Sequence, residues 1–469
     1  MKKIRFNLKL ALISLFVGLF GLSLGITVVL WGNPYRNTVS TYETTKSLSS
    51  YISKKEAIKD FDFAFRMIKS RHPVWIEKTN EAKNLRKLLT SKYQQNKKII
   101  LKNDEITVSK LYQLISEVYA ILGDGHTRCF YCTENLLSID DFLPLLAFGN
   151  PVAINGIDVN KFYEIFKTRF SFETDIGIKK NFFSNYVFRE DYLSLVGIDT
   201  SKNVVYTYKT KEGYEDFSHK FVLPTKDLIN ENINRLKPFL ESRRFSEEEI
   251  ESLSSSFVKT NETTPNNDKF VYFKIDTENS LGIFTLTECI CNDEYLKTLD
   301  TFFGLIKLCK IKNLAVDLRG NGGGNSWVAN EFIRYLDVDS YLDGAVEIRF
   351  GPFLKSYKAE IIENQKYDTN FAGNVFILIN NESFSAATDF AEYIQDNNLG
   401  KIIGEPSTNR PECYIDILRF QLPNSKIALS ISYKIVHRID QSKKDLLLEP
   451  DYPCPSNDAI NVLYEIIKK

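Results

Sequence analysis

The chain has 469 residues, and its 60 Lys and Arg side chains balance its 60 Asp and Glu side chains, so the formal net charge is zero. This length exceeds what one hydrophobic core supports, so two to four domains are expected. The balanced charge offers no basic face, which excludes nucleic-acid binding as the main function. An apolar share of 43%, with 34 Phe and 24 Tyr, indicates well-filled globular cores rather than a disordered chain.

Residues 10–31 carry no charged side chain and are long enough to cross a bilayer as a helix. The tail before them, residues 1–9, is basic, which predicts that the N-terminus stays in the cytoplasm. A cleaved signal peptide is the alternative, but no Ala-x-Ala site closes the segment, so we expect an uncleaved single-pass anchor. Residues 32–50 are then expected to form a polar stalk, with the folded part outside the cytoplasm at the cell membrane.

From residue 51 onward, apolar side chains recur at the spacing of amphipathic helices. One such stripe runs from Ile58 to Ile68 and stops before His72-Pro73, because proline cannot continue a helix. We therefore predict an N-terminal helical domain over residues 51–140.

Residues 141–251 follow a different pattern, in which turn residues separate short apolar runs. Asn155 and Gly156 lie between two such runs, and this dipeptide predicts a tight β-hairpin. We predict a small α+β segment that links the helical domain to the rest of the chain. The polar stretch 252–269 has the composition of a linker.

The last part of the chain, residues 270–469, has a dense α/β pattern. Two stretches in it, 313–325 and 374–405, share one plan: a short buried strand, a polar or glycine-rich turn, and a helix. This plan places both turns at the carboxyl edge of one sheet, where open α/β sheets hold their functional groups.

The first of these turns reads Arg319-Gly-Asn-Gly-Gly-Gly. Asparagine occupies the third glycine position of a dinucleotide fingerprint, and no Gly-Lys-Ser/Thr follows, so both phosphate-binding loops are excluded. Glycines leave amide N–H groups bare, so Gly322, Gly323 and Gly324 are candidate donors of an oxyanion hole. A tight turn without a ligand is the alternative. Asp317 and Arg319 are expected to brace the strand end as a charged pair.

The second turn ends at Ser385, where a strand gives way to a helix. A hydroxyl there lies in the positive field of the helix N-terminus, and the amide of Ala386 can face the same oxyanion. Ser385 is therefore the candidate nucleophile. An ordinary N-cap serine would give the same local pattern, and Ser383 is the substitute for either role.

These motifs resemble those of peptidase family S41, the tail-specific or C-terminal processing peptidases. Three segments agree with the family in order and spacing over residues 275–455: Leu-Ala-Val-Asp-Leu-Arg-Gly-Asn-Gly-Gly-Gly, Ser-Phe-Ser-Ala-Ala-Thr-Asp-Phe-Ala and Ile-Ile-Gly-Glu-Pro. The resemblance implies an α/β core of the ClpP/crotonase type, with a PDZ-like module in the linking segment. It also implies that Ser385 is the nucleophile and that Ala386 and one of the three glycines form the oxyanion hole.

The general base departs from the best-known branch of the family, which uses a lysine after the Gly-Glu-Pro/Thr motif. Arg410 stands there, and its guanidinium stays protonated and cannot accept the serine proton. A Ser-Lys dyad is therefore excluded unless Lys401 or Lys434 reaches the site. The Asp-Gly-His-Thr segment resembles the tricorn-like branch, whose base is a histidine. We therefore predict His126 as base and then acid, with His437 as runner-up.

A third group should hold the orientation of the imidazole. The tricorn-like branch uses a serine beside the histidine and a glutamate near the C-terminus. Gly125 replaces that serine here, so we assign the role to Glu449 in the closing Glu-Pro-Asp motif. Asp451 and Asp124 are the alternatives.

No metal or cofactor is predicted. Cys129 and Cys132 form a lone C-x-x-C pair among seven cysteines, and a zinc site needs a second pair at suitable spacing.

Taken together, these features predict a membrane-anchored, extracytoplasmic serine endopeptidase that acts through an acyl-enzyme. Its partner would be a protein or peptide substrate, bound by strand addition near the sheet edge. Because the family's lysine is missing, a non-catalytic member that binds a peptide or an apolar ligand is the alternative. An esterase or amidase is disfavoured, because Gly-x-Ser-x-Gly is absent around Ser385.

Overall fold

The computed structural model describes residues 33–133, 136–141, 143–185, 189–223, 225–242 and 269–468. The predicted tail and anchor, residues 1–31, lie outside these ranges, and so does nearly all of the predicted 252–269 linker. Among the described helices, none has both the length and the apolar character needed to cross a membrane.

Three long helices build the N-terminal body: α2 (Lys54–Arg71), α3 (Asn80–Leu101) and α4 (Val108–Tyr119). α2 begins with a capping box between Ser53 and Glu56 and ends before Pro73, as the sequence predicts. The shorter elements of this body are β1 (Tyr51–Ser53), η1 (Pro73–Trp75), β2 (Glu105–Thr107), η2 (Ala120–Leu122) and β3 (Arg128–Phe130).

The segment predicted as a stalk is packed against the folded part from residue 35 onward, where the Tyr35 hydroxyl lies 3.2 Å from the Tyr433 hydroxyl. The amide of Val39 donates to the carbonyl of Arg419 at 2.9 Å. The hydroxyl of Tyr42 donates to the carbonyl of Leu429 at 3.0 Å. The hydroxyl of Thr45 donates to the Lys426 carbonyl at 2.9 Å. Over these residues the chain is therefore not a free spacer, because its polar groups bond to a hairpin from the other end of the sequence.

The linking segment is a mixed α+β unit with a four-stranded sheet in the order β6-β5-β7-β8. Asn155 and Gly156 join β5 to β6 with φ of 49° and 73°, which confirms the predicted hairpin. No observation identifies the unit as a PDZ-like module. Its elements are β4 (Ser138–Ile139), α5 (Leu143–Phe148), β5 (Ala153–Ile154), β6 (Ile157–Asp158), α6 (Val159–Lys167), α7 (Asp175–Asn185), α8 (Glu190–Leu195), β7 (Val204–Lys209), β8 (Tyr214–His219), β9 (Phe221–Val222) and α9 (Lys226–Ser242).

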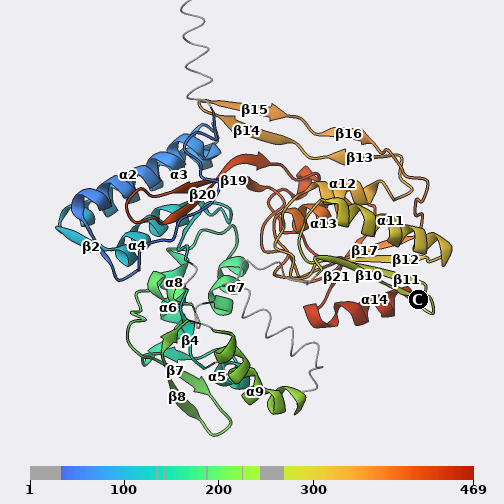
Figure 1. Ribbon diagram of the computed structural model, residues 1–469. Helices are drawn as coiled ribbons and strands as arrows, with labels where there is room; N and C mark the ends of the chain where they lie inside the picture. The colour runs from blue at the N-terminus through green and yellow to red at the C-terminus, as the bar shows by residue number, and fades with distance from the viewer. Residues whose placement is uncertain are drawn as a thin grey trace, which may run out of the picture.

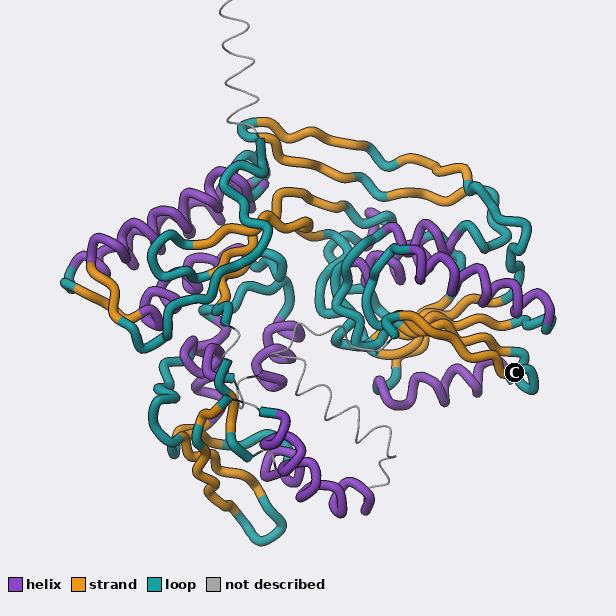
Figure 2. Tube along the Cα trace, in the orientation of Figure 1, coloured by secondary structure: helices purple, strands orange, loops and turns teal. Residues whose placement is uncertain are grey.

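The C-terminal body is a six-stranded sheet in the order β10-β11-β12-β17-β18-β21. β10 runs antiparallel to β11, and the remaining neighbours are parallel. α11, α12 and α13 cover one face and α14 the other (Figures 1 and 2). The elements are β10 (Val271–Asp276), β11 (Leu281–Leu286), α11 (Asp293–Leu308), β12 (Asn313–Asp317), α12 (Trp327–Ile333), β17 (Asn374–Ile379), α13 (Ala386–Asp396), β18 (Lys401–Gly404), β21 (Tyr452–Pro453), η4 (Ser456–Asp458) and α14 (Ala459–Ile467).

Two extensions connect this body to the N-terminal one. The first is a long ribbon in which β13 (Ser340–Asp343) pairs with β16 (Glu360–Glu363) and β14 (Val346–Phe350) pairs with β15 (Phe353–Tyr357). The second is the hairpin of β19 (Cys413–Gln421) and β20 (Ala428–Val436), which is followed by η3 (Gln441–Lys443). In Figure 1 both extensions reach from the C-terminal sheet toward α2 and α4.

The β19–β20 hairpin completes the core of the N-terminal body. Apolar side chains of both strands, among them Phe420 and Ile431, are buried in the same cluster as those of α2 and α4. At the hairpin turn, the carboxylate of Asp60 on α2 accepts from the amide and side chain of Asn424 and of Ser425. β20 also pairs with β3, so the hairpin carries the segment that follows His126.

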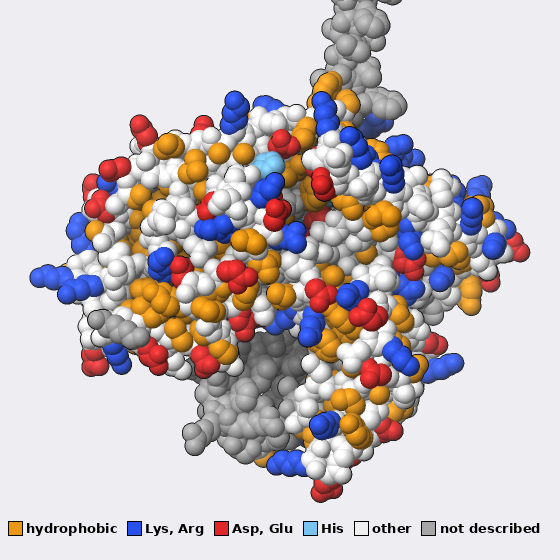
Figure 3. All heavy atoms as spheres, turned by 180° about the vertical axis from the view of Figure 1, so that it is seen from behind, with side chains coloured by type: hydrophobic (Ala, Val, Ile, Leu, Met, Phe, Trp, Pro, Cys, Tyr) orange, Lys and Arg blue, Asp and Glu red, His pale blue; other side chains and the backbone are white. Residues whose placement is uncertain are grey.

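The surface in Figure 3 shows basic and acidic side chains interspersed over the described part of that face. This mixture agrees with the zero net charge of the sequence. The face shown therefore lacks the continuous basic stripe that binding to nucleic acid requires.

Candidate active site

Ser385 lies at the sharp turn between β17 and α13, as the sequence predicts. Its backbone has φ of 54° and ψ of −124°, a conformation that L residues rarely adopt. Its hydroxyl makes no capping bond to the helix. The alternative of an ordinary N-cap serine is thereby excluded, and the Ser385 backbone is strained.

The glycine-rich turn after β12 lies directly against this serine. A Cβ on Gly323 would stand 2.8 Å from the Ser385 Cβ and 3.0 Å from the Ala386 nitrogen, so only glycine allows this approach. The N–H of Gly323 donates to the Asn321 side chain at 2.8 Å. Among the described residues, the N–H groups of Gly322, Gly324 and Ala386 have no protein acceptor, which leaves them available to an oxyanion.

The imidazole of His126 contacts Ser385, although the two residues are 259 positions apart in the sequence. Its Nε2 lies 3.0 Å from the Ser385 Oγ, and its ring stacks on that of Phe384 with 4.7 Å between centroids. The backbone is held by β20, since the hydroxyl of Ser430 donates to the His126 carbonyl at 2.7 Å. The hairpin therefore brings base and hydroxyl together.

Asp124 lies on the opposite edge of the ring. Its Oδ1 is 3.7 Å from the His126 Nδ1, too long for a hydrogen bond but close enough to act through its charge. The same carboxylate accepts from the His126 amide at 2.9 Å, and its Oδ2 accepts from Ser432 at 2.7 Å. His72 also bonds to it through Nε2 at 3.1 Å, and both side chains are fully buried.

These contacts shift two pKa values. Burial opposes ionisation of Asp124, but the bonds and charges of His126 and His72 hold its pKa well below the usual range. For His126, burial lowers the pKa, while the contact with Asp124 and the charges of Asp124 and Glu173 raise it overall. The carboxylate thus favours the protonated imidazole that forms when the ring accepts a proton.

Glu173, between α6 and α7, is a site residue that the sequence did not reveal. Its Oε1 accepts from the Gly125 amide at 3.0 Å, and its buried Oε2 has no hydrogen-bond partner among the described residues. Burial and the charge of Asp124 raise its pKa to about 7. The His126 Nδ1 and the carboxylates of Asp124 and Glu173 lie within 4.8 Å of one another, the spacing of metal ligands.

The loop after Gly404-Glu-Pro, where the resemblance implies a lysine, supplies an asparagine to the site. Asn409 is buried, and its Oδ1 accepts from the Ser385 amide at 3.1 Å and from the Thr388 hydroxyl at 2.7 Å. The neighbouring Arg410 is exposed. Lys401 is paired with Asp451 and Lys434 with Asp416, so neither lysine stands in as the base.

The other predicted site residues lie apart from the pair. Ser383 is buried and donates to the Leu318 carbonyl at 2.8 Å, while Asp451 accepts from the Ile402 amide at 2.9 Å. His437 faces Glu412, 3.2 Å away. The remaining one, Glu449, has an exposed side chain, whereas the His126 Nδ1 is buried, so Glu449 is not the group beside this nitrogen.

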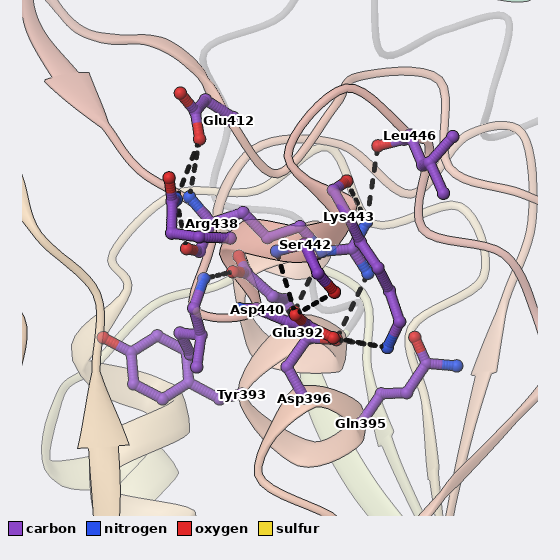
Figure 4. A network of polar contacts seen from close by, with 12 residues as sticks. Glu392, Tyr393, Gln395, Asp396, Glu412, Arg438, Asp440, Ser442, Lys443 and Leu446 are labelled. Atoms are coloured by element: carbon purple, nitrogen blue, oxygen red, sulfur yellow. Dashed lines mark hydrogen bonds and ion pairs between the residues drawn. The ribbon is translucent and has the colours of Figure 1, made fainter.

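Two charged clusters brace the elements that carry the site. Arg319 holds Asp317 with two bonds of 2.9 and 2.6 Å, which confirms the predicted pair at the end of β12. At the far end of α13, the guanidinium of Arg438 bonds both carboxylate oxygens of Asp396 at 2.9 and 3.2 Å (Figure 4). This contact ties the helix that begins at Ser385 to the segment that leaves the hairpin.

Known proteins resemble this chain in part of its sequence and in its fold. Residues 281–447 match the model of Peptidase family S41. Mature CPAF shares the fold, with a TM-score of 0.55 and 12% identity over 89% of this chain and 96% of that one. Its complex with lactacystin gives 0.57 and 12% over 88% and 97%, and the photosystem II D1 C-terminal processing protease gives 0.43 and 12% over 88% and 97%. No curated protein matches the sequence.

Proposed function

We propose that this chain, which belongs to peptidase family S41 and is a serine-type peptidase, cleaves internal peptide bonds through an acyl-enzyme on Ser385. The observation that carries this proposal is the 3.0 Å contact between the His126 Nε2 and the Ser385 Oγ. That distance allows direct proton transfer from the hydroxyl to the ring.

In the first step the Ser385 Oγ attacks the carbonyl carbon while the His126 Nε2 accepts its proton. The oxyanion accepts hydrogen bonds from the Ala386 amide and from the N–H of Gly322 or Gly324. His126 then donates the proton to the leaving amine, and water repeats the sequence on the acyl-enzyme. The charge of Asp124 stabilises the imidazolium formed in each half-reaction.

Peptide substrate would bind as an added strand. β19 is the last strand in the order of its sheet, and it begins at Cys413, four residues after Asn409. Because residues 39–43 already bond to the Arg419 end of this edge, a peptide would add along residues 413–417, where it would gain main-chain hydrogen bonds.

The experiment that tests the proposal is labelling with a fluorophosphonate, which reacts with activated serines. Ser385→Ala should abolish both labelling and peptide hydrolysis without unfolding the chain. Ser383→Ala is the matched control, because its hydroxyl is buried between strand ends, and it should keep the label. Labelling that survives in Ser385→Ala would refute the assignment.

The variant His126→Ala distinguishes a peptidase from the alternative, a non-catalytic protein that binds peptide. A peptidase loses turnover in this variant by on the order of 100-fold or more, whereas a binding protein keeps its affinity for peptide. Lactacystin, with which mature CPAF forms a complex, offers a second probe, since a competent Ser385 should lose fluorophosphonate labelling in its presence.

We further propose that residues 10–31 anchor the protein in the cell membrane with the peptidase part outside the cytoplasm. The uncharged stretch and the basic residues before it support this location. The full chain should resist extraction from membranes by alkaline carbonate, while a chain that begins at residue 33 should be released. Release of the full chain would contradict the anchor.

A further inference from the structure

A cavity of about 400 Å³ opens beside the catalytic pair. One wall is the ring of Phe384, which stacks on His126, and another is Phe172, whose ring centroid lies 5.4 Å from that of Phe384. Arg128, Lys180 and Glu382 supply its charges. A substrate residue next to the peptide bond attacked by Ser385 would therefore reach this cavity. We name the cavity the Phe384 pocket.

Arg128 is unusual among the half-buried arginines of the structure. Arg169 pairs with Glu117 at 3.0 Å and Arg189 with Asp191 at 2.8 Å. Within the described part of the chain, the guanidinium of Arg128 has neither an ion-pair partner nor a hydrogen-bond acceptor. The guanidinium carbon of Arg128 lies 5.8 Å from the centroid of the Phe170 ring. The pocket therefore contains a partly desolvated cation that can accept an anionic partner.

The other charges of the pocket leave an excess of positive charge. Glu382 is its carboxylate, and it is already paired with Lys180 at 2.8 Å. A second cavity of about 390 Å³ adjoins along α7, shares Lys180 with the first and adds Lys179. The surroundings of Arg128 therefore favour a negative group and disfavour a positive one.

From these observations we infer that the Phe384 pocket binds a carboxylate of the substrate through Arg128. A planar guanidinium fits a carboxylate with two parallel hydrogen bonds, and burial strengthens them. The carboxylate has two possible sources, an acidic side chain close to the cleaved bond or the C-terminus of a short substrate. This inference rests on the proposed function for its position, but binding can be measured without catalysis.

The test uses ten-residue peptides that differ at one position, Glu or Gln, each made as a C-terminal acid and as an amide. Binding is measured by fluorescence anisotropy in the Ser385→Ala background, and kcat/KM is measured with the wild-type enzyme. One carboxylate source should improve Kd and kcat/KM by roughly 10- to 100-fold over its neutral counterpart. The Glu-against-Gln and acid-against-amide comparisons identify which source it is.

Arg128→Gln should reduce this preference to near unity, and Arg128→Lys should keep part of it. Arg66→Gln is the matched control, because Arg66 also lies over an aromatic ring, that of Phe63 at 5.3 Å, but outside the pocket. The preference should also weaken as KCl is raised.

Equal affinity for all four peptide types, or a preference that survives in Arg128→Gln, would overturn the inference. The two proposals can fail separately. If the Ser385→Ala protein prefers the carboxylate but the wild-type protein takes no fluorophosphonate label, the proposed function is refuted and the assignment of the pocket is retained.

Discussion

His126 lies between a hydroxyl on one side and two carboxylates on the other, and this placement sets its pKa. Burial alone would favour the neutral ring, yet Asp124 and Glu173 raise the pKa of the imidazole. A general base must be neutral to accept a proton, so kcat/KM should rise with pH through this raised pKa. The two carboxylates therefore stabilise the protonated imidazole, and they also shift the pH range in which His126 can act as a base to higher pH.

Asp124→Asn tests this balance. The variant removes the charge that raises the His126 pKa and leaves burial to lower it, so the acid limb of the kcat/KM profile should move to lower pH. The maximal rate should fall on the order of 100-fold, because the imidazolium loses its stabilising charge. The measurement is the pH dependence of peptide hydrolysis between pH 5 and 9.

Glu173→Gln should shift the same limb in the same direction by a smaller amount, since Glu173 contributes less than Asp124 to the raised pKa. Asp276→Asn, at the end of β10, is the control, because this carboxylate bonds to Asn279 and Tyr464 and not to the site; it should leave the profile in place. An acid limb that stays fixed in Asp124→Asn would show that His126 is not the titrating base.

At the scale of elements, the site depends on two strand–turn–helix units that meet at one sheet edge. β12 ends in the glycine turn and β17 ends in the turn of Ser385, and the two strands are parallel neighbours. The turns touch at Gly323, where the backbone of one unit contacts the serine of the other. The oxyanion donors are therefore positioned by contact between turns rather than by either turn alone.

Gly323→Ala should disable the enzyme without unfolding it. The added methyl would meet the Phe384 carbonyl oxygen at 2.7 Å and the Ser385 Cβ at 2.8 Å, at a φ of +95° that alanine disfavours. We expect kcat to fall roughly 10²-fold or more, because the oxyanion donors move out of line. Gly304→Ala on α11, where nothing lies within 4 Å of the new methyl, should retain full activity.

Much of the arrangement of these elements could be predicted from the sequence. Strands, turns and helix starts each leave a pattern within a few neighbouring residues. The two turns, Ser385 and the Asn155-Gly156 hairpin all follow from a few neighbouring residues. Glu173 could not be found in this way, since it stands in no motif. Asn409 follows the Gly-Glu-Pro motif, but its role depends on contacts with Ser385 and Thr388, which the local pattern does not reveal. For Glu449, the resemblance supplied a role that the exposed side chain does not support here.

At the scale of the whole molecule, the β19–β20 hairpin makes the two bodies interdependent. It belongs by sequence to the C-terminal body, yet its apolar side chains complete the N-terminal core. The apolar residues of 427–436 favour a long strand, but this local pattern carries no information about its partner. That partner was decided by packing against α2 and α4 and by the bonds of Asp60 to the hairpin turn.

Phe420→Ala should show this dependence. The ring is fully buried in the N-terminal core, so its loss should cost about 3–5 kcal/mol of unfolding free energy. Activity should fall in parallel, because the hairpin also holds His126. Denaturant unfolding and peptide hydrolysis measured on the same samples check the coupling.

Phe353→Ala on β15, where the ring is 57% exposed, is the matched control and should change both quantities little. A Phe420→Ala protein with normal stability and activity would show that the hairpin does not couple the two bodies.

The position of the hairpin in the chain has a consequence during translation. His126 is made early, Ser385 follows 259 residues later, and residues 413–436 emerge from the ribosome later still. A growing chain that already contains both reactive residues lacks the strands that bring them together. We therefore expect the nascent chain to lack peptidase activity until residues 413–436 have emerged and paired.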